Sequence, residues 1–276
     1  MPSEKRARQR AAREARLAAM AKAQRRRRQT RNSIVVVVIA AAVVGIVFLV
    51  NSGGSPGKKS ATTTTTTAPK TANGRAQAAA NEVAVKAGCP SDPSTRVNTL
   101  SYKTEPAITI DPNKLYSATV KTTAGTFTMS LYAKTATETV NNFVFLADKG
   151  YYTCNIFHRV IPNFMDQTGD PTGTGSGSDG FDWKIENVPT SWVAGDVAMA
   201  NTGQPDSNEG QWFILVNPSA LGAGQYTLFG KVTSGYSVVQ TINNEGNSNA
   251  SANGVPPDVI QRILKVTIHE ANAASL

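Results

Sequence analysis

One stretch of the chain, residues 157–175, combines side chains that suit the binding of an apolar ring beside an amide. It contains one arginine, Arg159, and one glutamine, Gln167, among large apolar side chains such as Phe164 and Met165. Sites for small ligands are mostly apolar, with a few polar groups that fix the orientation of the ligand. Because no nucleophile is paired with a base here, the stretch predicts a site that aims hydrogen-bond donors at an amide.

The residues that other chemistries need are missing from the chain. His158 and His269 are the only histidines, no Cys-x-x-Cys motif occurs, and no pair of carboxylates stands in a polar cluster. The chain therefore lacks the residues that a metal site, a catalytic triad or a glycosidase site requires. We expect no metal and no cofactor. Residues 173–177 are glycine-rich, but no Gly-Lys-Ser/Thr follows, which favours a flexible loop over a phosphate-binding loop.

The positive charge of the chain is concentrated at its start. Residues 1–31 contain twelve of the 28 Lys and Arg residues and only two acidic ones, whereas the remainder has 16 basic and 17 acidic residues. The net charge of +9 therefore arises from the basic tail, because the remainder of the chain is nearly neutral. The tail has no interleaved aromatic residues and no readout module, so we expect no nucleic-acid partner.

An apolar run follows the basic tail directly. Residues 34–50 contain no charged and no strongly polar side chain, which is at the lower limit of length for a transmembrane helix. We expect a single-pass anchor in the cell membrane, with a cleaved signal peptide as the competing interpretation. The Lys and Arg residues before the run predict a cytoplasmic N-terminus and an extracytoplasmic domain after it. The tail either binds anionic lipid or acts only as a topology signal.

The predicted organisation after the anchor rests on composition. Residues 51–80 are rich in Thr, Gly and Pro and read as an extended linker, although an Ala-rich piece at 76–87 has the composition of a short helix. The two cysteines, Cys89 and Cys154, form either a disulfide or two free thiols. The complete prediction is a basic cytoplasmic tail at residues 1–33, a transmembrane helix at 34–50, the linker at 51–80, an irregular arm at 81–113, a folded domain at 114–270 and a C-terminal tail at 271–276.

Hydrophobic periodicity predicts a mainly β domain. Residues 116–122 and 125–132 alternate apolar and polar side chains around a short turn, as in a β-hairpin. In residues 135–149 the apolar side chains change to helical spacing, and the threonines at the start can cap that helix. Many short strands with two helices favour a closed antiparallel barrel with helical lids. The other predicted elements are strands at 156–161, 197–200, 212–216, 227–232 and 259–268 and a helix at 236–242.

Three blocks of the chain resemble the signature blocks of cyclophilin-type peptidyl-prolyl cis-trans isomerases. The blocks are residues 157–175, residues 195–203, and residues 209–216 followed by 226–232, in the order of that family. The resemblance covers residues 114–270. It implies a closed eight-stranded antiparallel barrel capped by two α-helices, and with the apolar run it suggests a bacterial, membrane-anchored form of the family.

The resemblance also implies roles for individual residues. It implies an enzyme that accelerates rotation about X-Pro peptide bonds in proline-containing polypeptides. With the predicted anchor, we expect these substrates to be exported or surface proteins, and we expect the catalytic domain to be monomeric. The expected catalytic residues are Arg159, Phe164, Gln167, Gln211 and Phe213, and the expected substrate-binding residues are Met165, Ala200, Asn201, Leu221 and Tyr226. The alternative is a non-catalytic module that binds proline-containing segments.

Elementary chemistry agrees with the role implied for Arg159. Twisting a prolyl peptide bond breaks its conjugation, which leaves a pyramidal nitrogen that can accept a hydrogen bond. A fixed guanidinium meets that nitrogen only in the twisted state, and interactions made only in the transition state speed a reaction. Strand alternation points His158 away from Arg159 and Trp212 away from Phe213, so we expect both to be structural.

The chain departs from the family pattern near the implied site at Leu221 and Tyr226, and also at Asn163 and Asp166, where Gly and an apolar or small residue are common in the family. Many members of the family have a Trp and a His where this chain has Leu221 and Tyr226. The tyrosine can still form an aromatic wall. The missing indole donor predicts weak inhibition by cyclosporin.

Overall fold

The computed structural model describes residues 71–221 and 225–272. The predicted basic tail, the predicted transmembrane helix at 34–50 and most of the predicted linker lie outside the described residues. Within the described residues, no helix is both long enough and apolar enough to cross a membrane. All described residues belong to one compact unit, residues 66–276.

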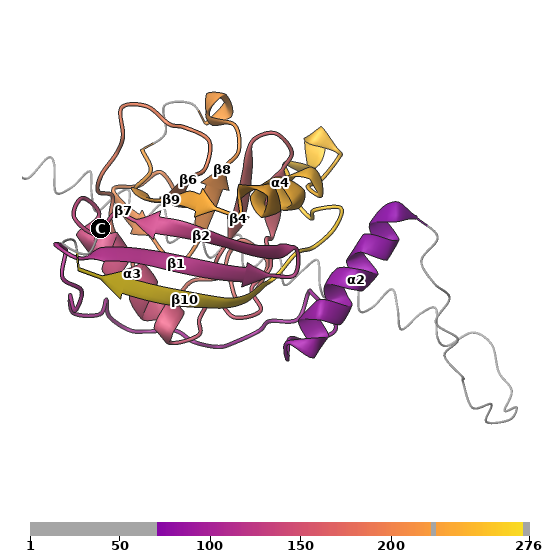
Figure 1. The fold of residues 1–276 in the computed structure, drawn as a ribbon, viewed down its shortest axis with the longest axis horizontal. Helices are drawn as coiled ribbons and strands as arrows, with labels where there is room; N and C mark the ends of the chain where they lie inside the picture. Colours follow the sequence, from indigo (N-terminus) through magenta and orange to yellow (C-terminus); the bar gives the residue numbers. More distant parts are fainter. Residues whose placement is uncertain (1–70, 222–224, 273–276) are drawn as a thin grey trace, which may run out of the picture. The chain divides into compact units, whose positions relative to one another are not determined.

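An eight-stranded antiparallel sheet forms the centre of the domain (Figure 1). Its strands follow the order β10-β1-β2-β9-β6-β8-β4-β3. A second sheet pairs β5 (Trp183–Lys184) with β7 (Asp206–Asn208). The strands of the large sheet are β10 (Ile263–Ala271), β1 (Leu115–Thr122), β2 (Gly125–Leu131), β9 (Leu228–Ser234), β6 (Asp196–Met199), β8 (Trp212–Leu215), β4 (Met165–Thr168) and β3 (Arg159–Ile161).

The prediction of a closed barrel is wrong, because the edge strands β3 and β10 do not pair with each other. Among the described residues, the two ends of the sheet are joined only outside regular strand pairing, through contacts that include an isolated antiparallel bridge between Ile156 and Arg262 and a hydrogen bond from Cys154 N to the carbonyl of Ile263 at 2.7 Å. The strand predicted at 156–161 is regular only from Arg159 onward. Cys154, with φ of 64°, has a left-handed backbone that an extended strand cannot contain, so regular pairing does not continue past this point. The sheet is therefore curled but open.

The sequence prediction also missed strand β4. The strand predicted here covered only residues 156–161, but after it the chain turns back at Asn163, where φ is 57°, and pairs β4 with β3. Asparagine tolerates this left-handed conformation better than most residues do. The resulting hairpin is what places Arg159 opposite Gln167.

Within residues 71–221 and 225–272, three α-helices accompany the sheet: α2 (Ala72–Lys86), α3 (Thr137–Asp148) and α4 (Tyr236–Asn244). Helix α3 packs near β10, and α4 packs against β2, β3 and β4 (Figure 1). Of the four residues at helical spacing, Val140, Phe143 and Ala147 of α3 are buried and Val144 is half-buried. Two short 3₁₀ turns, Pro218–Ala220 and Ala250–Ala252, lie in the loops.

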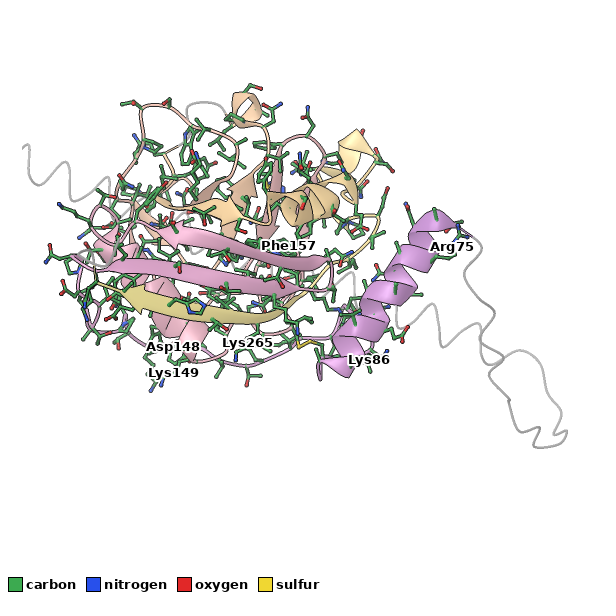
Figure 2. The ribbon with its side chains drawn as sticks, viewed as in Figure 1. Arg75, Lys86, Asp148, Lys149, Phe157 and Lys265 are labelled. Atoms are coloured by element: carbon green, nitrogen blue, oxygen red, sulfur yellow. A yellow bond between two sulfur atoms is a disulfide. The ribbon has the colours of Figure 1, made fainter. Side chains whose placement is uncertain are left out.

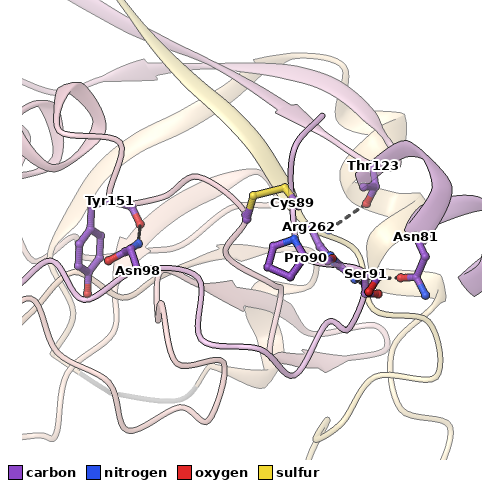
Figure 3. Close-up of a disulfide and its surroundings, with 9 residues drawn as sticks. Asn81, Cys89, Pro90, Ser91, Asn98, Thr123, Tyr151 and Arg262 are labelled. Carbon is purple, nitrogen blue, oxygen red and sulfur yellow. Dashed lines mark hydrogen bonds between the residues drawn. A yellow bond between two sulfur atoms is a disulfide. The ribbon is translucent and has the colours of Figure 1, made fainter. Parts of the chain in front are cut away.

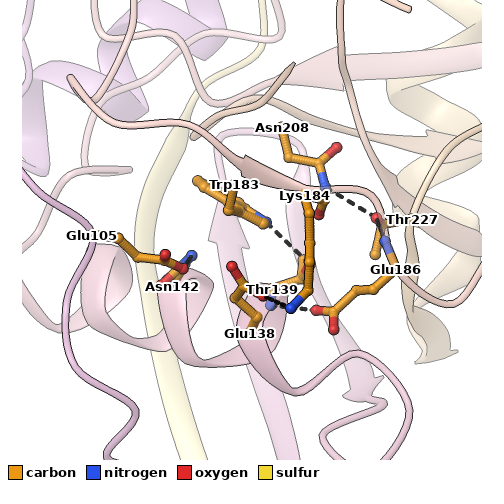
Figure 4. Close-up of polar contacts among 9 residues, drawn as sticks. All are labelled: Glu105, Glu138, Thr139, Asn142, Trp183, Lys184, Glu186, Asn208 and Thr227. Atoms are coloured by element: carbon orange, nitrogen blue, oxygen red, sulfur yellow. Dashed lines mark hydrogen bonds and ion pairs between the residues drawn. The ribbon is translucent and has the colours of Figure 1, made fainter. Parts of the chain in front are cut away.

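The expected threonine cap of α3 is wrong. The residue before the helix is Ala136, whose side chain cannot cap it, and the N–H of Thr139 instead donates to Glu186 Oε1 at 2.6 Å. Lys184 forms an ion pair with Glu138 at 2.7 Å from the same segment (Figure 4). A carboxylate near a helix N-terminus is stabilising because it meets unsatisfied N–H groups. The loop around Glu186 thus fixes the start of α3.

The main core lies between the large sheet and the helices. Phe157, labelled in Figure 2, belongs to this core. It is fully buried, as are Phe143, Trp212 and Phe229. The rings of Phe143 and Trp212 meet edge to face with centroids 5.9 Å apart, which is a favoured aromatic geometry. The prediction that Trp212 belongs to the core is confirmed.

The chain before the sheet is attached to the domain by a disulfide. Cys89 and Cys154 are bonded, with Cα atoms 5.5 Å apart (Figure 3). Helix α2 begins at Ala72, inside the stretch predicted to be linker, and it buries Ala80 and Ala84. Thr71 caps the helix, since its side chain accepts a hydrogen bond from the N–H of Gly74 at 3.0 Å.

A buried arginine holds the same region. Arg262 is 1% exposed and donates through Nη2 to Asn81 Oδ1 at 3.0 Å and to the carbonyl of Ser91 at 3.3 Å (Figure 3). Its Nη1 donates to the carbonyl of Pro90. The residues between α2 and β1 then run irregularly along the domain, as shown by the bond from Tyr102 N to the carbonyl of Asp179 at 2.7 Å.

Candidate active site

Strand pairing brings several predicted site residues to one face of the sheet. Arg159 of β3 lies opposite Gln167 of β4, and Gln167 lies opposite Phe213 of β8. Ala198 of β6 lies opposite Phe213. Directly paired residues in an antiparallel sheet point to the same face, so these four side chains share one face. Their alternating neighbours point into the core.

His158 shows the other side of this alternation. It is 3% exposed, and neither ring nitrogen has a hydrogen-bond partner among the described residues. Burial lowers the pKa of His158 to about 4, so the imidazole is neutral at pH 7. The prediction that His158 is structural is confirmed.

The guanidinium of Arg159 is held by three hydrogen bonds. Nη1 donates to Gln167 Oε1 at 3.2 Å, Nε donates to the carbonyl of Asn253 at 3.1 Å, and Nη2 donates to Asn253 Oδ1 at 2.9 Å. Arg159 is half-buried, and burial lowers the pKa of its guanidinium from the ordinary value. Within the described residues, these bonds leave N–H groups on both Nη nitrogens for a further acceptor.

A relay of amides continues from Arg159. Gln167 Nε2 donates to Gln211 Oε1 at 3.0 Å, and Gln211 Nε2 donates to the carbonyls of Gly177 at 3.0 Å and Gly175 at 3.3 Å. Because Oε1 of Gln167 accepts from a guanidinium, its amide nitrogen must be the donor toward Gln211. The orientation of both amides is therefore set by the arginine at one end and by the glycine-rich loop at the other.

The glycine-rich loop is not the loosely attached loop that the sequence predicted. Asp170, which is buried, accepts hydrogen bonds from Thr172 N at 2.7 Å, Thr174 N at 3.1 Å and Gly177 N at 3.0 Å. Burial by itself would raise the pKa of Asp170, but hydrogen bonds from the Thr172 hydroxyl and from the N–H groups of Gly177 and Thr172 stabilise the charged carboxylate and hold its pKa below the ordinary value. The loop carbonyls that receive Gln211 are thereby fixed.

An apolar cluster separate from the main core lies on the same face as Arg159. Its buried members include Met165, Phe213 and Leu215. The rings of Phe213 and Tyr226 meet edge to face with centroids 5.3 Å apart, so Tyr226 does form an aromatic neighbour of Phe213. The full cluster consists of Met165, Ala198, Phe213 and Leu215, with Ile161, Phe164, Trp192, Ala200, Leu221 and Tyr226 packed against them.

Asn201 is the one predicted substrate-binding residue whose side chain lies outside the apolar cluster. Its Nδ2 donates to the carbonyl of Gln225 at 2.9 Å, and its Oδ1 accepts from the N–H of Gly203 at 3.0 Å. Next to it, the N–H of Ala200 donates to the carbonyl of Gln211 at 2.9 Å. The backbone of residues 200–201 is therefore held against the end of β8.

Two residues at the site were missed by sequence reasoning. Asn253 binds Arg159 from 94 positions away, and Trp192 packs against the apolar cluster. The pair Asn253-Gly254 is a turn signal in the sequence, but a turn signal does not say which strand the turn will reach. Trp192 had no signal beyond its residue type. Gly195, which follows it closely, donates its N–H to the carbonyl of Leu215 at 2.7 Å and brings this segment to the end of β8.

Comparison with known proteins identifies the class to which this sheet and this cluster belong. The family model described as cyclophilin type peptidyl-prolyl cis-trans isomerase/CLD matches residues 117–268, more than half of the chain. The chain belongs to this family of enzymes. Helix α2 and the residues as far as the start of β1 lie outside the matched range.

Individual relatives support the same assignment. Peptidyl-prolyl cis-trans isomerase-like 1 of Emericella nidulans is 40% identical over 160 residues, which are 56% of this chain and 96% of that protein. Peptidyl-prolyl cis-trans isomerase ppi1 of Schizosaccharomyces pombe is 44% identical over 128 residues, 45% of this chain and 82% of that protein. A crystal structure of a cyclophilin type isomerase of Cryptosporidium parvum has a TM-score of 0.51 and 28% identity, and it covers 56% of this chain and 98% of its own.

Proposed function

We propose that this chain catalyses the cis-trans isomerisation of X-Pro peptide bonds and that Arg159 stabilises the twisted amide. The observation that carries the proposal is a guanidinium held by three hydrogen bonds on the same face as a separate apolar cluster. X-Pro isomerisation is slow enough to limit protein folding, since it takes tens to hundreds of seconds without a catalyst. The proposed biological role is therefore the folding of proline-containing chains.

The proposed chemistry needs no covalent intermediate. Rotation faces a barrier of ~18–20 kcal/mol because the nitrogen lone pair is conjugated with the carbonyl. In the twisted state the prolyl nitrogen becomes a hydrogen-bond acceptor, and an N–H on Nη1 or Nη2 of Arg159 donates to it. This bond exists only near the transition state, so it lowers the barrier without strengthening ground-state binding.

The neighbouring side chains divide binding between an apolar and a polar part. Phe164, Met165 and Phe213 receive the prolyl ring. Gln167 retains one N–H on Nε2 for a substrate carbonyl, whereas Gln211 spends its donors on the loop and can only accept from a substrate N–H. The proposed remaining contacts come from Ala200, the backbone of Asn201, Leu221 and Tyr226.

A solved relative supports proline-containing substrates. The Cryptosporidium parvum isomerase has also been crystallised in the presence of the dipeptide Ala-Pro, and that structure has a TM-score of 0.51 and 29% identity to this chain. At 29% sequence identity, the likeness between that isomerase and this chain extends beyond a shared fold. The substrate class proposed for this chain is accordingly a peptide with an X-Pro bond.

A protease-coupled assay on an X-Pro peptide tests the proposal with residues 66–276, the compact unit. Arg159→Ala should lower kcat/KM by about 10²–10³-fold, as removal of one preorganised transition-state donor does in other enzymes. Arg159→Lys should recover little, because an ammonium lacks the planar fork that matches two acceptors at once. The matched control is Lys265→Ala, which removes an exposed cation from β10 (Figure 2).

Two outcomes of this assay would defeat the enzyme proposal. One is a wild-type chain that leaves the spontaneous rate unchanged, and the other is equal rates for wild type and Arg159→Ala. Peptide binding without isomerisation would then favour a non-catalytic module that binds proline-containing segments.

We further propose that the domain is tethered outside the cytoplasmic membrane by residues 34–50, with residues 1–33 in the cytoplasm. The support is the apolar run, the basic residues before it and the Cys89–Cys154 disulfide, since disulfides persist mainly in oxidising compartments. The clients would then be exported or surface proteins, and the basic tail could add anionic-lipid binding. The catalytic domain is proposed to act as a monomer.

Fractionation tests the tether directly. An intact N-terminal peptide should be found with the membrane fraction, and the domain should be digested by protease added from outside intact cells. Val43→Arg, which costs about 2.5–3.5 kcal/mol at the centre of a membrane helix, should reduce the membrane-bound share. Recovery of a chain that begins after residue 50 would instead support a cleaved signal peptide.

A further inference from the structure

A loop far away in the sequence supplies most of the hydrogen bonds that hold Arg159. The backbone carbonyl and the side-chain Oδ1 of Asn253 accept from Nε at 3.1 Å and from Nη2 at 2.9 Å. Gln167 accepts from the remaining nitrogen, Nη1. The side chain of Arg159 therefore meets an acceptor at each of its three nitrogens, and two of the three belong to Asn253.

The loop that contains Asn253 is itself fixed on β3. Val160 N donates to the carbonyl of Gly254 at 2.9 Å, and Asn247 N donates to the carbonyl of Val160 at 3.2 Å. The approach is close, because a Cβ atom on Gly254 would lie 2.7 Å from the carbonyl oxygen of Val160. Asn253 has φ of 52°, a left-handed conformation that asparagine adopts readily. The loop thus continues the hydrogen bonding of the sheet beyond its edge strand.

We propose that Asn253 is a positioning residue that aims the Arg159 guanidinium at the twisting prolyl nitrogen, a role that rests on the proposed isomerase activity. A free arginine side chain populates many rotamers, and holding it in one of them in advance removes that cost from the transition state. The two acceptors of Asn253 occupy Nε and one side of Nη2, which fixes the plane of the guanidinium. Gln167 fixes its rotation within that plane from the other side.

Three variants separate this role from a purely structural one. Asn253→Gly keeps the left-handed backbone and the backbone carbonyl but removes Oδ1. Asn253→Asp keeps an oxygen acceptor at the same place. Asn249→Ala is the matched control, because the Oδ1 of Asn249 accepts from Ser251 N at 3.0 Å within the same loop and does not reach Arg159.

The experiment uses the full-length chain in detergent and an X-Pro peptide whose cis and trans signals are resolved by NMR. Exchange spectra measure the interconversion rate of bound peptide, and titration measures the peptide Kd. Asn253→Gly should slow interconversion by about three- to tenfold, as loss of one hydrogen bond of ordinary net strength does, with Kd changed by less than about twofold. Asn253→Asp should restore the rate, and Asn249→Ala should leave both quantities unchanged.

The order parameter of the Arg159 Nε–H bond gives a readout that does not depend on activity. It should fall in Asn253→Gly and recover in Asn253→Asp, because Oδ1 restrains the guanidinium. A normal interconversion rate in Asn253→Gly, a defect confined to Kd, or a defect that aspartate does not repair would overturn the positioning role. If the wild type itself fails to isomerise the peptide, the proposed function fails, while the order parameters still decide whether Asn253 restrains Arg159.

Discussion

Removal of the disulfide should destabilise the domain by a magnitude that follows from its place in the chain. Cys89 and Cys154 are 65 positions apart, so the bond closes a loop of about 66 residues in the unfolded chain. Loop-closure entropy for that length corresponds to about 4 kcal/mol at 25 °C. The variant Cys89→Ala/Cys154→Ala is suited to the test, because both side chains lie in a small apolar cluster with Ala84 and Leu264.

The loss should show first in the segment that the bond attaches. Without it, α2 and the chain just after it keep the hydrogen bonds of Arg262 to Asn81, Pro90 and Ser91 (Figure 3) and those between Gln77 and Ile260. Amide protons of α2 should therefore exchange faster than those of β1 and β2, because local opening no longer requires unfolding of the sheet. The melting temperature should fall by about 8–16 °C for a domain of this size.

Urea denaturation of residues 66–276, followed by circular dichroism without reductant, measures the free energy of unfolding. Ser91→Ala is the control, since it changes the neighbouring arm and keeps the carbonyl that Arg262 uses. A loss below about 1 kcal/mol in the double variant would refute the entropic reasoning. Unchanged exchange in α2 would refute the local attachment.

Three further predictions concern single side chains. Burial raises the pKa of Asp166 from its ordinary value of 3.8 to about 8, so the folded protein retains a proton that the unfolded chain releases, and stability should fall as pH rises from about 4 to about 8. Asp166→Asn should be more stable than wild type at pH 8 by at least about 1 kcal/mol in urea, and identical pH profiles would contradict this. Trp183 and Trp212 are buried in the main core, so a change in tryptophan emission on binding an X-Pro peptide should come from Trp192 and should disappear in Trp192→Phe. Cyclosporin should inhibit the wild type weakly and Leu221→Trp about tenfold more strongly, the value of one hydrogen bond, whereas low-nanomolar inhibition of the wild type would refute the reasoning.

Local patterns in the sequence predicted the parts of the fold that depend on near neighbours. Period-two alternation pointed His158 away from the face of Arg159 and placed Trp212 in the core, and both side chains are buried. Helical spacing predicted the buried face of α3, including Phe143. These predictions succeed because the direction of a side chain within one strand or helix is set by the backbone geometry of that element alone. The motif blocks likewise indicated the family, which the match over residues 117–268 shows.

Contacts between distant residues were decided only by the tertiary structure. The sequence could not tell whether the two cysteines are bonded, because the distance between their Cα atoms depends on the path of every intervening residue. It predicted a closed barrel, whereas the irregular backbone around Cys154 leaves β3 and β10 unpaired. The sequence also indicated Arg159 as a site residue, but it did not indicate that Asn253 would accept hydrogen bonds from it. A side chain and the acceptors that aim it can lie on segments far apart in the chain, and only the folded sheet determines which loop reaches which strand.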